Sequence, residues 1–146
     1  MNNNLDKGLL LLRLGLGTVF IMHGWQKLFV IGHTGLTGFF AGAGIPFPAL
    51  SAAIATAVEL VGGVALIAGL GTRIAGVLLA FTMLVAVTTV HLANGFFLPN
   101  GYEFALTLLL ANSALALTGA GRLSLDATLF RQPARPAEAA SFRTAA

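Results

Sequence analysis

A small set of ionisable and hydrogen-bonding side chains in this 146-residue chain lies within or at the ends of long apolar stretches. In the segment His23-Gly-Trp-Gln-Lys27, the polar residues stand at i, i+3 and i+4, so a helix would carry them on one face. An ionisable group placed in hydrocarbon costs at least ~2.5 kcal/mol and by default marks a pairing or functional site. The candidate site residues are His23, Gln26, Lys27, Glu59, His91, Asn94, Tyr102 and Glu103.

Several of these side chains also have ordinary structural interpretations. Lys27 could extend to outer head groups, or it could pair with Glu59 or Glu103. Glu103 could be a carboxylate favoured by the N-terminus of its own helix, and His91 could be an interfacial histidine with a satisfied ring. Glu59 is harder to explain structurally, because a carboxyl group near the middle of a membrane must be protonated, paired or hydrated.

The composition indicates a membrane protein. Hydrophobic residues make up 57% of the chain and charged residues only 9%, against roughly 25% charged residues in soluble domains. There is no cysteine, so electron transfer would need a bound cofactor or a partner protein. The net charge of +3 is concentrated in the C-terminal tail and does not indicate nucleic-acid binding.

The predicted fold class is all-α: an integral membrane four-helix bundle over residues 8–121, after an N-terminal lead of residues 1–7. Apolar stretches of spanning length predict membrane helices at about 8–29, 50–70, 74–92 and 102–118. The glycine-rich residues 30–50 predict an interfacial or re-entrant piece, with Pro46 and Pro48 suited to the first turn of the next helix. Gly15, Gly17 and Gly24 would let neighbouring helices approach closely. Residues 122–146 predict a short amphipathic stub followed by a disordered cytosolic tail.

The distribution of basic residues orients the predicted bundle. With four spans, one side collects all the arginines and Lys7, whereas the other side has only Lys27. By the positive-inside rule, both termini are expected in the cytoplasm of a bacterial cell, as in a multi-pass inner-membrane protein. At 1.5 Å per helical residue, Glu59 would then lie about 14 Å below the outer surface and the two helical histidines in the outer third. The polar set is thus predicted to form an outward-facing funnel with Glu59 at its base.

Several stretches together resemble the DoxX family of small bacterial membrane proteins. They include Leu-Leu-Arg-Leu-Gly-Leu-Gly at 11–17, His-Gly-Trp-Gln-Lys-Leu at 23–28, Val-Glu-Leu-Val-Gly-Gly at 58–63, Val-His-Leu-Ala-Asn-Gly-Phe-Phe at 90–97 and Gly-Tyr-Glu-Phe-Ala at 101–105. The resemblance implies a four-helix inner-membrane protein. It also implies a redox setting, since DoxX-like proteins include or are related to subunits of a thiosulfate:quinone oxidoreductase, and others associate with superoxide dismutase and a sulfurtransferase under oxidative and thiol stress.

Three functions remain open on this basis. The first is a membrane subunit of an oxidoreductase system that binds a quinone-like or other small ligand in the funnel. The second is a non-enzymatic scaffold that docks soluble redox enzymes on the cytosolic side, with the polar set fixing helix register. The third is a small proton-coupled transporter, which would require a homodimer. The catalytic residues and the cofactor stay unknown. A quinone is one candidate, and haem or a metal ion is disfavoured because no helix carries paired histidines.

Overall fold

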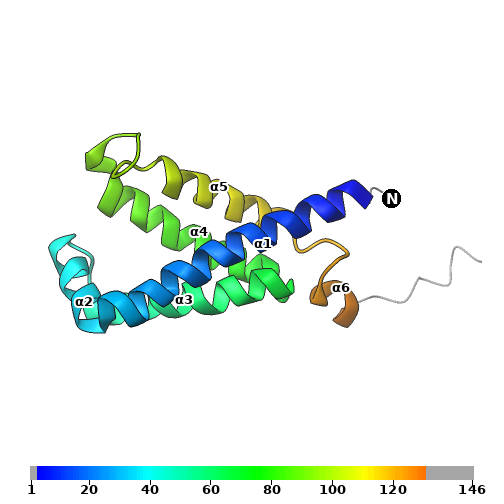
Figure 1. Ribbon diagram of the computed structural model, residues 1–146, viewed down its shortest axis with the longest axis horizontal. Helices are drawn as coiled ribbons and strands as arrows, with labels where there is room; N and C mark the ends of the chain where they lie inside the picture. The colour runs from blue at the N-terminus through cyan, green and yellow to red at the C-terminus, as the bar shows by residue number, and fades with distance from the viewer. Residues whose placement is uncertain (1–2, 131–146) are drawn as a thin grey trace, which may run out of the picture.

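The structure, a computed structural model, describes residues 3–130, and these form helices with no strand among them (Figure 1). The all-α prediction is confirmed. The elements in chain order are α1 (Asn3–Trp25), the π-helix η1 (Gln26–Ile31), α2 (Gly32–Gly42), α3 (Pro48–Ala68), α4 (Thr72–Val85), the π-helix η2 (Ala86–His91), the 3-10 helix η3 (Leu92–Asn94), α5 (Glu103–Thr118) and α6 (Leu125–Leu129).

Four long helices run up and down the molecule, so that its features gather at two ends (Figure 1). The most extensive packing joins α1 to α3 and α4 to α5, and α3 also packs on α4 and α2. The first end, called the terminal end, comprises the start of α1, the α3–α4 turn and residues 119–130. The other, called the α2 end, comprises η1, α2, η2, η3 and the loop 95–102.

Two of the helical stretches are long and apolar enough to cross a membrane. They are Pro48–Ala68 and Thr72–Asn94, with mean hydropathies of 2.0 and 2.1, while Glu103–Thr118 is apolar but shorter. Only 28% and 33% of the residues in their most apolar windows are buried, whereas a core helix of a soluble protein would be mostly buried. Large apolar side chains such as Val61, Ile74 and Phe81 lie on the surface. Such an apolar surface is expected to face lipid.

Glycines set the close approach of α1 to α3. A Cβ added to Gly17 would lie 2.6 Å from the carbonyl oxygen of Gly63, and one added to Gly63 would lie 2.8 Å from that of Gly17. Gly24 packs similarly on Leu60. The predicted packing role is therefore confirmed for Gly17 and Gly24. It is wrong for Gly15, around which a Cβ would meet nothing within 4 Å, because that residue faces away from α3.

Local sequence signals explain where α3 begins and ends. Pro48 occupies its first turn, as predicted, since a missing N–H costs nothing there. The same prediction is wrong for Pro46, which lies in the bend before the helix. At the other end, Gly69 takes a left-handed conformation with φ of 68°. The N–H groups of Gly69 and Leu70 then donate to Leu66 and Ala65, which satisfies carbonyls that the helix leaves free. The preceding glycine-rich segment, predicted to be interfacial, forms α2, which packs on α3 through the buried Leu36.

Candidate functional site

A buried ion pair joins Lys27 of η1 to Glu59 of α3. The Nζ atom of Lys27 donates to both carboxylate oxygens of Glu59. The carboxylate is sealed, with 1% of its side chain exposed, whereas 20% of the Lys27 side chain is exposed. Glu59 stands eleven residues after Pro48, about 16 Å along a helix of about 31 Å. Of the two alternatives for Lys27, pairing with Glu59 is therefore the one that the structure shows.

Lys27 is four positions after His23, a spacing that would put both side chains on one face of an α-helix, but the two contact different helices. The ring of His23 lies 6.3 Å from that of Phe104 at the start of α5, at an interplanar angle of 40°. Lys27 instead reaches α3. The π-helix η1 begins between them, at Gln26, and its i→i+5 bonding changes the direction of the side chains that follow. The shared helix face predicted for His23, Gln26 and Lys27 assumed a regular α-helix through this segment.

A second polar group organises the loop 95–102 at the α2 end. His91 donates from Nδ1 to the carbonyl oxygen of Asn100 at 2.9 Å, and Glu103 Oε1 accepts the N–H of Leu98 at 2.8 Å. The Tyr102 ring packs edge-on against Phe96 with a centroid distance of 5.3 Å. These three contacts hold the loop across the ends of η2 and α5. They support the structural interpretation of each side chain and leave Nε2 of His91 available.

The eight candidate residues thus divide into two groups. Within residues 3–130, no hydrogen bond, ion pair or ring contact connects Lys27 or Glu59 to the polar residues of the 91–103 region. His23 is the link between the first group and α5, through Phe104. Gln26 and Asn94 are exposed, and Asn94 donates to Val90 of its own helical segment at 3.1 Å. A single pocket that all eight residues line stays a prediction.

A third buried charge is Arg13 on α1, and its contacts are structural. Its side chain is fully buried. It donates from Nη1 to the carbonyl oxygen of Leu66 at 3.5 Å and from Nη2 to that of Leu123. The guanidinium fills the space beside Gly69, where an added Cβ would overlap it. Arg13 therefore fastens α1 to the end of α3 and to the chain that follows α5.

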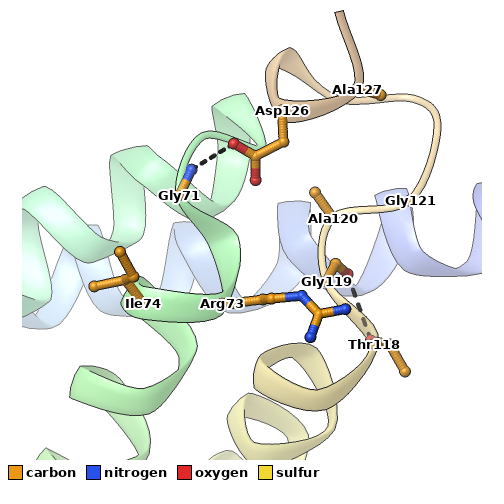
Figure 2. A pocket seen from close by; sticks show the side chains of 9 residues that line it. All are labelled: Gly71, Arg73, Ile74, Thr118, Gly119, Ala120, Gly121, Asp126 and Ala127. Carbon is orange, nitrogen blue, oxygen red and sulfur yellow. Dashed lines mark hydrogen bonds between the residues drawn. The ribbon is translucent and has the colours of Figure 1, made fainter. Parts of the chain in front are cut away.

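Two aspartates at the terminal end, Asp6 and Asp126, make structural contacts that the sequence reasoning did not predict. Asp126, in α6, accepts the N–H groups of Gly71 at 2.8 Å and Thr72 at 3.2 Å and so caps α4 from another part of the chain (Figure 2). Asp6 accepts the N–H of Arg122 at 2.9 Å. The Ser124-Leu-Asp126 sequence could have signalled the start of α6, since Ser124 accepts the N–H of Ala127. By contrast, no sequence signal indicated that Asp126 would contact the turn at Gly71, 55 residues earlier in the chain. Residues 131–146, predicted to be a disordered tail, lie outside the described residues.

No group of three or more His, Cys, Asp or Glu side chains within residues 3–130 could hold a metal ion. The side chains near the α2 end can form hydrogen bonds and exchange protons. Lys27, His23 and His91 supply donors there, and Glu59 supplies a buried carboxylate.

Comparison with known proteins identifies the family of this chain. The family model described as DoxX matches residues 8–92, which is more than half of the sequence. The chain belongs to the DoxX family. The match begins in α1 and ends in η3, so it includes the α1–α3 pair, the Lys27–Glu59 contact and His91.

Curated relatives cover nearly the whole chain. A Bacillus subtilis (strain 168) protein named "Putative oxidoreductase CatD" is 41% identical over 131 residues, which is 90% of this chain and 93% of that protein. The "Inner membrane protein YphA" of Escherichia coli (strain K12) is 32% identical over 124 residues, 81% of this chain and 87% of the relative. No solved structure matches. Family membership and the name of the Escherichia coli relative support a membrane protein.

Proposed function

We propose that this protein is the membrane subunit of an oxidoreductase system, spanning the bacterial inner membrane four times with both termini in the cytoplasm. In this proposal it binds a small lipophilic ligand of the quinone class near the Lys27–Glu59 pair. Support comes from the DoxX family, from a relative named as an oxidoreductase and another named as an inner-membrane protein, and from the apolar outer surfaces of α3 and α4.

The charge distribution supports the orientation. Lys7, Arg13, Arg73 and Arg122 lie at the terminal end, whereas Lys27 is the basic residue near the α2 end in the described chain. Basic residues are retained on the cytoplasmic side of inner-membrane proteins. The ligand site would then open in the outer half of the membrane. A reporter such as alkaline phosphatase fused after residue 96 should be active, and one fused after residue 70 should be inactive.

The observation that carries the ligand proposal is the unequal burial of the ion pair. Glu59 is sealed and Lys27 is partly exposed, so a ligand reaches the Lys27 side chain before the carboxylate. Two of the three Nζ hydrogens are directed to the carboxylate, which leaves one for an acceptor on a ligand. His23 is exposed on the same segment and makes no hydrogen bond with the rest of residues 3–130. A quinone carbonyl is an acceptor of the required kind.

Proton supply follows from the same arrangement. When a quinone is reduced, each oxygen gains a proton, and the ammonium group of Lys27 stands between the ligand position and a buried carboxylate. Before reduction, Glu59 would stabilise the charged lysine in the apolar surroundings. Lys27 would then donate one of the two protons to a reduced oxygen and be left neutral, and the second proton would reach the other oxygen from water. Because the chain has no cysteine, the two electrons would come from a bound cofactor or a partner protein.

The test is titration of the purified full-length protein in detergent with short-chain ubiquinone and menaquinone analogues. Wild-type protein should bind one of them, and His23→Ala and Lys27→Met should weaken binding about tenfold or more. Thr107→Ala is the matched control, because Thr107 is exposed on α5 and its hydroxyl bonds only its own helix. Binding that is unchanged in both site variants would remove the ligand proposal.

A further inference from the structure

A cavity of about 460 Å³ lies at the terminal end, away from the proposed ligand site. It lies between the first turn of α4, the turn 118–121 that follows α5, and α6 (Figure 2). These three segments are brought together by the Asp126 cap on Gly71 and Thr72 and by the hydrogen bond from Asp126 N to the carbonyl oxygen of Gly69 at 2.9 Å. The cavity is thus built by contacts between parts of the chain that are far apart in sequence.

Arg73 is the charged donor in this cavity. Its side chain extends from α4 toward the turn 118–121 (Figure 2). The residue is exposed and makes no hydrogen bond or ion pair through its side chain with the other described residues. An arginine offers five N–H donors in a planar fork, the geometry that suits a phosphate.

Backbone donors line the same cavity. Ala120 is 6% exposed, and its N–H has no hydrogen-bond partner within residues 3–130. Buried backbone N–H groups are almost always paired, with water or an ion where protein is absent. The N–H of the neighbouring Gly121 is also unpaired among these residues. A group with acceptor oxygens in the cavity would satisfy both.

Glycine keeps the arginine and the turn close together. Gly119 has φ of 80°, a conformation that other residues adopt at a cost. A Cβ added there would lie 3.2 Å from Nε of Arg73. The absence of a side chain at Gly119 therefore lets the guanidinium lie close to this turn.

The surroundings select the kind of anion. Asp126 also lines the cavity, and although its oxygens accept two N–H groups, its negative charge disfavours a doubly charged ion. A singly charged phosphate diester is the better fit. Ile74 and Leu117, beside the cavity at the ends of α4 and α5, are 70% and 78% exposed. Acyl chains attached to the phosphate could run along these apolar side chains.

We infer that the cavity at Arg73 binds the phosphodiester head group of an anionic membrane lipid. This inference rests on the part of the proposed function that places the protein across a membrane, with Arg73 at the level of the inner head groups. It does not depend on the quinone site at the α2 end. Basic pockets between helices at the cytoplasmic surface are a known way to bind anionic lipids.

The experiment is calorimetric titration of the full-length protein in detergent micelles with dioctanoyl phosphatidylglycerol. Wild-type protein should bind it, and should bind dioctanoyl phosphatidylcholine at least about fivefold more weakly. Arg73→Gln should weaken phosphatidylglycerol binding about fivefold or more, and Arg73→Lys by less. Arg122→Gln is the matched control, because it removes the same charge from the same end without altering a residue that lines this cavity.

Three outcomes would overturn the inference. Phosphatidylglycerol binding could be unchanged in Arg73→Gln, or lowered equally in Arg122→Gln, which would indicate only a general attraction of charge. Alternatively, inorganic phosphate could bind as tightly as the lipid and in an Arg73-dependent manner, which would make the ligand a free anion. Should Arg73→Gln fail to fold, wild-type protein still tests the inference. Phosphatidylglycerol should bind more tightly to it than either phosphatidylcholine or inorganic phosphate, and equal binding would overturn the inference. Failure of quinone binding at the other end would leave all these results unaffected.

Discussion

Two buried cations on the first helical segment, Arg13 and Lys27, are stabilised in different ways. Arg13 is held by neutral carbonyl oxygens of Leu66 and Leu123, and no part of it is exposed. Lys27 is held by the carboxylate of Glu59 and keeps 20% of its side chain exposed. Both contact or approach α3, one at its C-terminal end and the other near its middle.

The difference separates a structural charge from one that can act on a ligand. The C-terminal carbonyls of a helix carry partial negative charge and hold the Arg13 guanidinium, and the Asp126 carboxylate lies close enough to interact with that charge. The N–H groups of Arg13 are also enclosed by protein, since no part of this residue is exposed. The exchangeable protons of Lys27, by contrast, lie between a sealed carboxylate and the outside of the molecule. A buried charge is thus evidence of function only when part of it remains accessible.

The largest effect is expected when Lys27 is replaced by methionine. This change leaves the carboxylate of Glu59 buried without its partner, and breaking one half of such a pair costs about 3–5 kcal/mol. Glu59→Gln should cost less, because Lys27 can move its ammonium group outward. Thermal unfolding in mild detergent would measure both. The double variant Lys27→Met/Glu59→Gln should regain much of the loss, and equal costs for the two single variants would contradict the unequal burial on which the ligand proposal rests.

Arg13→Ala should have the second largest effect, a loss of about 2–3 kcal/mol in the free energy of unfolding. It leaves an empty space beside Gly69 and removes the partner of the Leu123 carbonyl, but no uncompensated charge remains. Leu11→Ala is the control on the same helix, because that side chain is 70% exposed. A loss for Arg13→Ala as large as that for Lys27→Met would show that the two cations are not stabilised differently.

Some elements and residues of this structure could be predicted from the sequence, and others could not. The cost of burying charge pointed to Glu59, and the apolar stretches placed α3 and α5 close to their observed bounds. The predicted helix 74–92 corresponds to α4, η2 and the start of η3 together. Two features could not be predicted. The π-helix at Gln26 gives no periodic sequence signal, so the directions of His23 and Lys27 were set as if the α-helix continued. The cap that Asp126 places on α4 joins positions 55 residues apart, and only tertiary structure brings those together.

The closeness of α1 and α3 between the two cations provides the next test. Gly63→Ala would place a methyl group 2.8 Å from the carbonyl oxygen of Gly17, and the strain should cost about 1–3 kcal/mol. The matched control is Gly15→Ala, where the methyl group meets nothing within 4 Å and better helix propensity should stabilise by up to about 1 kcal/mol. Thermal unfolding of the two variants should therefore shift in opposite directions. Equal shifts would mean that α1 and α3 are not packed through these glycines.

His23→Phe should have the smallest effect on stability, below about 0.5 kcal/mol, because His23 is exposed and makes only a ring contact with Phe104. Phenylalanine preserves that contact and removes the hydrogen-bonding nitrogens. If the accessible groups near Lys27 form a ligand site, quinone-analogue binding should weaken about tenfold while the unfolding temperature stays the same. His33→Phe, at an exposed position in α2, should leave both unchanged. A His23→Phe protein that binds normally would assign His23 to the contact between α1 and α5, and the site would then have to rest on Lys27 alone.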